Sequence, residues 1–283
     1  MFYTSSDVAV CAEYLSSYGT NYKKAVALLP KHMRDATTII YAFVRYADEI
    51  IDNPTSTDPE RELIEWMDAW RETFHANISH HPILDAMKKV CTSHTISYRH
   101  SEDFLKSMLR DSEKTTYETY EELVAYMWGS ASVVGLMMCN IIGIVDTDIP
   151  YQKHAQALGE AMQLTNFIRD IEEDYHERGR IYIPQEWLRA YRLDDAWIRE
   201  KTMTEDSQKL ITMMSEKAHE LFEYGNAGIA YLDPKGQSAV HLSSRIYENI
   251  LCKLKRNNYN VFAKNNNTRC DMIYIMIQHY LNL

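Results

Sequence analysis

The chain has 283 residues, of which 46% are apolar and 25% charged, with 9 Gly and 7 Pro. This composition supplies a sizeable core and excludes collagen-like, low-complexity and disordered chains. The formal net charge of −10 argues against a general electrostatic grip on nucleic acid or anionic lipid. An anionic substrate would therefore have to bind at a local cluster of positive charge.

The cysteines and the N-terminus point to an intracellular protein. The five cysteines form no CxxC pair: Cys11, Cys91, Cys139, Cys252 and Cys270. This spacing favours neither a disulfide framework nor a zinc site. The N-terminus lacks the basic start and long apolar run of a signal peptide, so we expect a cytoplasmic protein. The longest apolar run, residues 133–145, is too short to span a bilayer, which needs about 20 residues, and we expect a buried core helix there.

Prolines and turn-forming residues divide the chain into long segments rich in helix-forming residues, and strand-like alternation is almost absent. Residues 31–52 contain no helix breaker and are followed by Asn53-Pro54, which ends a helix. Further helices are predicted near residues 5–17, 60–76, 83–93, 101–113, 118–143, 151–177, 203–231, 237–262 and 268–281. The turn-rich stretches between them are as short as ordinary helix connections. We therefore expect one all-α domain.

The first candidate site lies on the predicted helix 31–52. Asp48 and Asp52 are four residues apart, so both carboxylates lie on one face of a helix, about a turn from each other. Tyr41 and Arg45 fall on the same stripe. The stripe therefore combines an aromatic ring, a cation and two acids.

The predicted helix 151–177 carries a second stripe of the same kind. Gln163, Asn166, Asp170 and Asp174 share one face of this helix. An arc of apolar residues that includes Phe167 lies beside them. The polar stripe therefore borders the side of the helix that faces the core.

Paired carboxylates that occur twice favour a metal site. Like charges one turn apart cost a helix roughly 0.2–0.5 kcal/mol, and a divalent cation would offset that cost. Mg²⁺ prefers oxygen ligands and is commonly held by one or two carboxylates plus substrate phosphates. We therefore expect the two acidic helices to clamp a diphosphate through bridging metal ions. The alternative is that both acidic patches are solvated helix faces.

The segments that carry these stripes resemble a known family. Residues 27–52 and 158–188 closely resemble the two aspartate-rich regions of the squalene and phytoene synthase family. Residues 120–143 and 245–262 resemble its central and C-terminal helices, so the resemblance covers most of the chain. The run QLTNFIRD followed by EDYHERGRIYIP is most similar to bacterial phytoene synthases.

The resemblance implies a single domain over residues 1–283 with an isoprenoid synthase-like helical bundle around a central cavity. It implies Mg²⁺, with Mn²⁺ as the alternative, held by Asp48, Asp52, Asn166, Asp170 and Asp174. The positions that match contacts to the diphosphates or reacting carbons are Tyr41, Arg45, Gln163, Asn166, Arg169 and Tyr247. Tyr126 matches a pocket tyrosine of the family.

The implied reaction joins two geranylgeranyl diphosphates head to head, through prephytoene diphosphate, to give phytoene for carotenoid biosynthesis and release diphosphate. The alternative is dehydrosqualene or squalene synthesis from two farnesyl diphosphates, with NADPH expected only for squalene. A non-catalytic relative, and a terpene cyclase or prenyltransferase with another acceptor, also stay open, although the intact acids argue against the non-catalytic relative. Peripheral membrane contact for release of an oily product stays open, and no segment demands it.

Several positions depart from the family pattern. Glu49 stands where many relatives carry a second Asp. Lys23 and Lys24 lie in residues 18–25, where many relatives have a Ser-rich stretch near the diphosphate, and their role is open. Trp128, Ser132 and Val133 replace the Tyr, Gly and Thr of the commonest central-helix pattern, and these changes bear on chain length and product.

Overall fold

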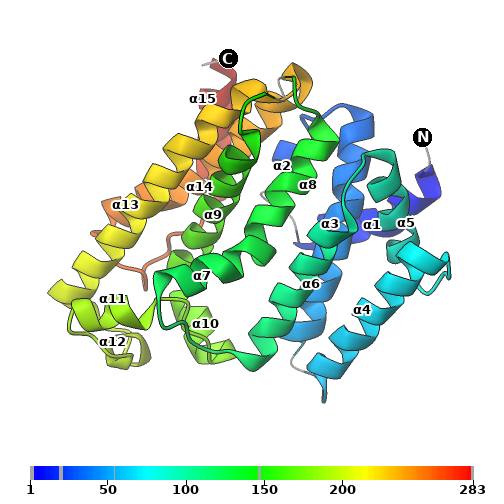
Figure 1. Ribbon diagram of the computed structural model, residues 1–283. Helices are drawn as coiled ribbons and strands as arrows, with labels where there is room; N and C mark the ends of the chain where they lie inside the picture. The colour runs from blue at the N-terminus through cyan, green and yellow to red at the C-terminus, as the bar shows by residue number, and fades with distance from the viewer. Residues whose placement is uncertain (1–2, 19–21, 54, 146–147, 282–283) are drawn as a thin grey trace. The chain divides into compact units, whose positions relative to one another are not determined.

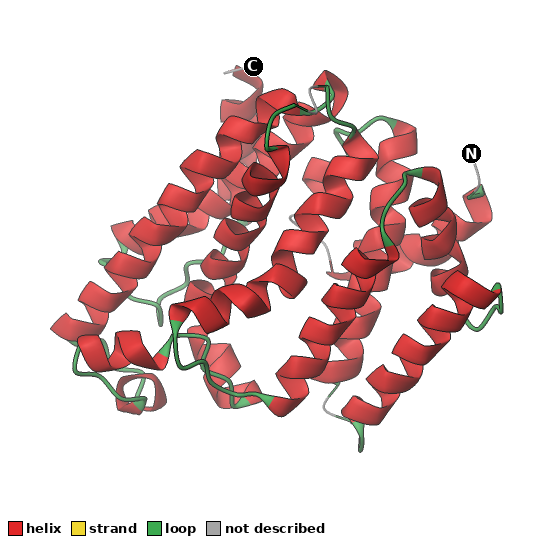
Figure 2. Cartoon of the chain, viewed as in Figure 1, coloured by secondary structure: helices red, strands yellow, loops and turns green. Residues whose placement is uncertain are grey.

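The computed structural model describes residues 3–18, 22–53, 55–145 and 148–281. Helices joined by loops make up this part of the chain (Figure 2). The β-type pairing among these residues consists of isolated bridges, Thr116 with Ile181 and Ile144 with Leu232. The predicted all-α class is therefore confirmed.

The contacts divide the chain into two compact units, each assembled from three segments. Unit 1 comprises Met1–Glu113, Val133–Tyr151 and Ala230–Val240. Unit 2 comprises Lys114–Ser132, Gln152–Ile229 and His241–Leu283. The order of the helices can be followed by colour in Figure 1. That the whole chain forms one domain stays a prediction.

Unit 1 is organised around one long amphipathic helix. Its helices are α1 (Ser5–Tyr18), α2 (Tyr22–Val26), α3 (Lys31–Asp52), α4 (Pro59–Ala76), α5 (Pro82–Ser93), α6 (Tyr98–Glu113) and α8 (Val133–Ile142). Helices α1, α4, α5, α6 and α8 all pack against α3. Along α3 the buried residues Ile39, Phe43 and Ala47 recur every four positions and are inaccessible to solvent, as expected for a stripe that faces a core. The bounds of α3 match the predicted helix 31–52.

Unit 2 holds the remaining helices. They are α7 (Tyr120–Met127), most of α9 (Tyr151–Arg169), α10 (Ile171–Arg178), α11 (Gln185–Ala190), α12 (Ala196–Arg199), α13 (Glu205–Ala227), most of α14 (Pro234–Arg256) and α15 (Arg269–Leu281). The short helices α2, α11 and α12 were not predicted, because four to six residues give too few turns for a periodic pattern.

Two predicted helices end earlier than expected. The predicted helix 237–262 runs instead from Pro234 to Arg256, since proline is well suited to the first turn of a helix. It ends before Asn258 and Tyr259, which adopt left-handed φ angles of 53° and 56°. The predicted helix 203–231 is α-helical only to Ala227 and continues as a 3₁₀ turn.

The central helix contains a π-helical turn. Helix α7 runs into the π turn Trp128–Ser132 and then into α8, which together make a helix of 23 residues, Tyr120–Ile142. In the described part of the chain this helix alone is long and apolar enough to cross a membrane, and 61% of its most apolar stretch is buried, as in a core helix. Residues 133–142 are buried or half-buried except for the exposed Asn140. The predicted helix 133–145 is too long, because the helix ends before Gly143 (φ 90°) and Val145 is exposed.

All five cysteines are free thiols. Cys11, Cys91 and Cys139 are buried, and burial raises the pKa of Cys139 to about 12. A thiol with so high a pKa carries no reactive thiolate at neutral pH. These findings agree with the prediction of no disulfide framework.

Candidate active site

In unit 1 the first acidic stripe lies at the C-terminal end of α3. Arg45 forms ion pairs with both Asp48 and Glu49. Burial disfavours the charged guanidinium, but the two carboxylates, together with Tyr41, raise the pKa of Arg45 overall. Asp52 follows one turn further along, half-buried. The structure thus brings together Tyr41, Arg45 and Asp48 as the sequence predicts, and it adds Glu49 to the cluster.

In unit 2 the second acidic stripe spans a helix break that the sequence did not predict. Helix α9 ends at Arg169, and Asp170 adopts φ −103° and ψ 12° before α10 begins. The backbone hydrogen bonds continue through the break, since Asp170 N donates to Asn166 O and Asp174 N donates to Asp170 O, both at 2.8 Å. The helical spacing of the acids therefore survives, as predicted.

The carboxylate of Asp170 is held by the neighbouring arginine. Arg169 donates from Nε to Oδ1 at 2.7 Å and from Nη2 to Oδ2 at 2.5 Å. Burial disfavours the Arg169 charge, but Asp170 more than offsets it and raises the pKa of Arg169. Tyr247 on α14 also acts on the Arg169 charge, which places this predicted substrate residue in the same cluster.

Asp174 carries the most perturbed carboxyl group of the stripe. Burial, and then repulsion from Asp170, raise its pKa to about 7, against the opposing pull of Arg178 and Arg180. Arg178 Nη1 donates to Asp174 Oδ1 at 3.1 Å, and Arg178 Nη2 donates to Glu173 Oε1 at 2.7 Å. Asp174 is 13% exposed, and a mostly shielded acid with a strongly raised pKa is typical of functional sites.

The amides of the second stripe leave one acceptor unused. Asn166 Nδ2 donates to Gln163 Oε1 at 3.3 Å. The buried Asn166 Oδ1 has no hydrogen-bond partner among the described residues. Leaving a buried acceptor unpaired costs about 1–3 kcal/mol, so this oxygen is suited to bind a cation or a donor from a ligand.

Tyr126, at the end of α7, lies in an aromatic cluster of unit 2. It is buried, with ring centroids 5.3 Å from Tyr117, 5.7 Å from Tyr182 and 6.2 Å from Phe167. Tyr182 in turn stacks on Phe167 at 4.2 Å. Phe167 directly follows Asn166 in α9, so the aromatic cluster adjoins the second acidic stripe.

The donor set of the second stripe fits a hard divalent cation. Asp170, Asp174 and the unused oxygen of Asn166 are oxygen donors, which Mg²⁺ prefers. Among the residues described, no three His, Cys, Asp or Glu side chains form a metal-binding group. Mg²⁺ is commonly held by one or two carboxylates, with phosphate oxygens and water as its further ligands.

Lys23 and Lys24, whose role the sequence leaves open, belong to unit 1. Lys23 and Lys24 lie on the short helix α2, Lys23 exposed and Lys24 half-buried. Residues 19–21, in the altered stretch that precedes them, lie outside the described residues. A surface pocket near the start of α13 and the end of α14 contains none of the predicted site residues.

Sequence reasoning missed Arg178, Arg180, Tyr117 and Tyr182. Arg178 could have been found, because it lies four residues after Asp174 and an acid at i with a cation at i+4 pairs on a helix. Arg180 is buried beyond the end of α10, and no periodic pattern extends to it. The two tyrosines come from loops, so only the folded chain brings them to Tyr126.

Solved structures of known enzymes share this fold. A dehydrosqualene synthase in complex with a ligand superposes with a TM-score of 0.88 at 24% identity, over 98% of this chain and 97% of that one. A squalene synthase from Alicyclobacillus acidocaldarius gives a TM-score of 0.82 at 25% identity, over 90% and 95% of the two chains. The fold is therefore of the isoprenoid synthase class.

Sequence comparisons define the family. A family model described as squalene/phytoene synthase matches residues 15–272. The phytoene synthase of Arthrospira platensis is 28% identical over 272 residues, 91% of this chain and 87% of that protein. The 15-cis-phytoene synthase of Synechocystis sp. is 31% identical over 271 residues, 90% and 78% of the two chains. The chain belongs to the squalene/phytoene synthase family, whose members are prenyltransferases that act on prenyl diphosphates.

Proposed function

We propose that the protein is a Mg²⁺-dependent phytoene synthase of the cytoplasm, which condenses two geranylgeranyl diphosphates through prephytoene diphosphate to phytoene. The observation that carries the proposal is that each acidic stripe has its own arginine, Arg45 with Asp48 and Arg169 with Asp170. Relatives named phytoene synthase, at 28–31% identity over about 90% of the chain, support the choice of product.

The acids act as paired cation ligands in this proposal. Asp48 and Asp52 hold one part of the metal set, and Asp170, Asp174 and Asn166 hold another. Bound Mg²⁺ supplies Lewis-acid stabilisation of the departing diphosphate. Asp174 must be ionised to bind a cation, and its raised pKa means that a proton competes with the cation near neutral pH.

The arginines position the diphosphates. In the structure Arg45 and Arg169 are both committed to carboxylates of their own stripes, so each guanidinium is already oriented beside a cation ligand. A planar guanidinium can bind a phosphate through two parallel hydrogen bonds. Arg45 and Arg169 therefore orient the leaving groups, and Tyr41, Gln163 and Tyr247 complete the contacts in the proposed site.

The aromatic cluster protects the allylic cation that forms when the carbon–oxygen bond breaks. Tyr126, Phe167 and Tyr182 are buried and pack ring to ring, so water is excluded around them. Aromatic faces attract cations, more strongly when both partners are desolvated. Tyr126 thus serves as the proposed catalytic residue of the central helix.

A second candidate is synthesis of dehydrosqualene or squalene from two farnesyl diphosphates. It is favoured by the fold similarity to a squalene synthase at a TM-score of 0.82 and 25% identity. Both candidates use the same diphosphate chemistry and differ in the length of the prenyl chain. NADPH is needed only if the product is squalene.

Direct competition between the substrates tests the proposal. Purified protein with Mg²⁺ receives equal concentrations of geranylgeranyl and farnesyl diphosphate, with and without NADPH, and the ratio of forty- to thirty-carbon hydrocarbon is followed over time. We expect the forty-carbon product to predominate, and we expect NADPH to leave the product ratio unchanged. A thirty-carbon product formed preferentially would establish the second candidate instead.

A further inference from the structure

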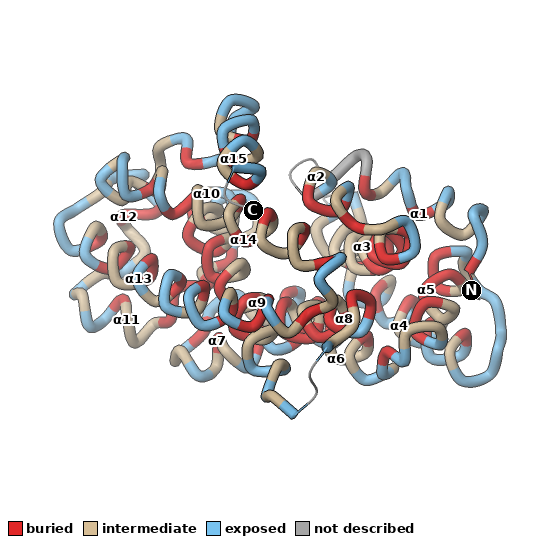
Figure 3. Tube along the Cα trace, turned by 90° about the horizontal axis from the view of Figure 1, so that it is seen from above, coloured by how far each residue is buried: buried red, intermediate tan, exposed pale blue. Residues whose placement is uncertain are grey.

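Helix α15 presents apolar side chains on both of its sides. Met272, Ile275 and His279 are at most 5% exposed and anchor the helix in unit 2. The opposite side carries the α15 apolar stripe, which comprises Cys270, Ile273, Tyr274, Ile277, Tyr280 and Leu281. The large side chains of this stripe are between 50% and 77% exposed. At 100° per residue the stripe fills an arc of about 120°, and Figure 3 shows how much of α15 is exposed.

Such a concentration of exposed apolar side chains on one helix is unusual for this chain. Other exposed large apolar residues in the described part are scattered over separate elements, such as Val10, Ile64 and Ile78. Single exposed apolar residues are normal, but a contiguous exposed patch marks a binding surface. Because the buried side of α15 holds the helix in place, the α15 apolar stripe is already exposed on one face without any rearrangement.

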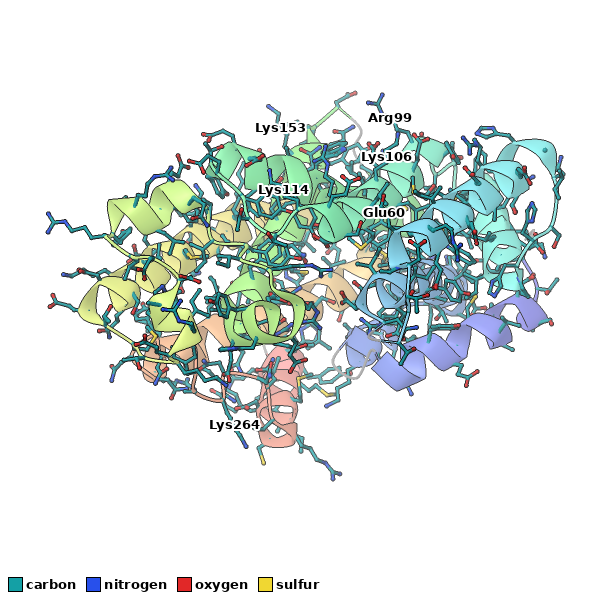
Figure 4. The ribbon with its side chains drawn as sticks, turned by 90° about the horizontal axis from the view of Figure 1, so that it is seen from below. Glu60, Arg99, Lys106, Lys114, Lys153 and Lys264 are labelled. Carbon is teal, nitrogen blue, oxygen red and sulfur yellow. The ribbon has the colours of Figure 1, made fainter. Side chains whose placement is uncertain are left out.

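The segment leading to α15 is basic. Residues 253–269 contain five cations and no Asp or Glu, in a chain of net charge −10. Lys255, Arg256, Lys264 and Arg269 are exposed, and Lys264, labelled in Figure 4, precedes α15 by five residues. The first acid after the segment, Asp271, is already paired with Lys253 at 2.7 Å. That ion pair uses the charge of Lys253, and the other four cations of the segment are exposed.

We infer that the α15 apolar stripe and the basic segment 253–269 form a docking surface for an anionic lipid bilayer. An apolar helix face flanked by Lys and Arg is the composition of helices that lie in the plane of a membrane interface. Tyr274 and Tyr280 add amphipathic rings, which favour the headgroup level. Each basic residue near an anionic leaflet strengthens the attraction.

Charge distinguishes this occupant from a second copy of the chain. A symmetric dimer through α15 would bring two copies of the same basic segment toward one interface, and like charges would oppose it. An anionic bilayer instead complements the segment. The surface uses none of the proposed catalytic residues, so the inference goes beyond the proposed reaction and can fail or succeed without it.

Vesicle flotation of the full chain tests the inference. The protein is mixed, without substrate, with vesicles of phosphatidylcholine alone or of phosphatidylcholine with phosphatidylglycerol. We expect binding to the anionic vesicles, weakening with added salt. The double variant Ile273→Glu/Ile277→Glu should lower the partition coefficient about tenfold or more, and Lys255→Gln/Lys264→Gln should abolish the preference for anionic lipid.

The matched control is Ile64→Glu/Ile78→Glu, which changes two isoleucines of similar exposure outside α15 and should leave binding unchanged. Light scattering in the absence of vesicles gives the oligomeric state of each variant. Equal loss of binding in the control pair, or no binding to anionic vesicles at all, would overturn the inference. A dimer of the wild-type chain that dissociates only in the α15 variant would overturn it in favour of a second copy.

Discussion

Arg169 grips the carboxylate of the next residue, Asp170, with two hydrogen bonds of 2.7 and 2.5 Å at the point where α9 gives way to α10. The pair is three-quarters shielded from solvent, since each side chain is 25% exposed. Two parallel bonds fix both the carboxylate plane and the guanidinium plane. The proposed metal ligand and the proposed diphosphate contact are therefore oriented by each other.

Replacing Arg169 with lysine should break this mutual orientation while preserving the charge, because a lysine ammonium cannot form the two-bonded fork. We expect kcat to fall roughly 100-fold, the usual cost of losing one preorganised donor at developing charge. The measurement is the steady-state rate of diphosphate release. Arg189→Lys is the control, since Arg189 pairs with Glu118 at an exposed position, and a similar loss there would contradict the role given to Arg169.

Asp174→Asn should stabilise the fold and abolish activity. The folded-state pKa of Asp174 is raised to about 7, above the value of about 3.9 for an unfolded chain, so ionisation destabilises the native state. The penalty is fully present above pH 7 and disappears as pH falls toward about 4. Its upper bound is about 4 kcal/mol at 1.36 kcal/mol per pKa unit.

Thermal unfolding with a chelator present measures this effect. The amide introduced by Asp174→Asn carries no charge, and Arg178 keeps its bond to Glu173. We expect a higher Tm for the variant at pH 8, and a difference that shrinks between pH 7 and pH 4. A variant that is less stable than the wild type at pH 8 would mean that the Asp174 carboxylate is a net stabiliser.

Asp48→Asn and Glu49→Gln should differ in their effect on the metal requirement, although both residues pair with Arg45. Asp48 is a proposed ligand, so its amide variant should lower the rate at least about 100-fold and raise the Mg²⁺ concentration for half-maximal rate. Glu49→Gln should cost less than tenfold and leave the Mg²⁺ dependence in place. Titration of the initial rate with Mg²⁺ checks both predictions. A larger loss of rate in Glu49→Gln than in Asp48→Asn would mean that Glu49 is the metal ligand.

Gly159→Ala should destabilise the contact between α9 and the π turn of the central helix. A Cβ at Gly159 would lie 2.8 Å from the backbone oxygen of Ala131, so a helix must shift, at a cost of about 1–3 kcal/mol. Denaturant unfolding measures that cost. In Gly179→Ala nothing lies within 4 Å of the new Cβ, and only the φ of 65° is strained, so this control should lose about 1 kcal/mol and keep its activity. A Gly159→Ala variant that loses no more stability than Gly179→Ala would contradict the tight contact at Gly159.

The sequence predicted the ends of a helix well where strong helix-breaking residues flank it. Pro30 and Asn53 bound α3 as the sequence indicates. The break at Asp170 contains no Gly or Pro that would predict it. The π turn at Trp128–Ser132 lies against α9, where a Cβ at Gly159 would come within 2.8 Å of Ala131 O, and a local sequence pattern does not show this contact. Beyond the end of α14, Asn258 and Tyr259 adopt left-handed φ angles. Asparagine is several-fold enriched in that conformation, but tyrosine is not, and the conformation is uncommon for any residue other than glycine.

The candidate site was predictable to the extent that it lies on helix faces. Asp48 with Arg45, and Asn166 with Asp170, follow from spacing alone. The raised pKa of Asp174 depends first on its burial, and the cluster around Tyr126 includes Tyr182, which is distant in sequence. Burial and long-range packing are properties of the folded chain, so a periodic pattern does not contain them.

The product formed from geranylgeranyl diphosphate tests the central claim most directly. Wild-type protein, Asp48→Asn and Asp170→Asn are each incubated with geranylgeranyl diphosphate and Mg²⁺, their folding is checked by circular dichroism, and the extracted hydrocarbon is identified by mass spectrometry. The account predicts phytoene from the wild type without NADPH, and none from either folded variant. A folded Asp48→Asn or Asp170→Asn variant that still makes phytoene, or a folded wild type that makes no forty-carbon hydrocarbon, would contradict it.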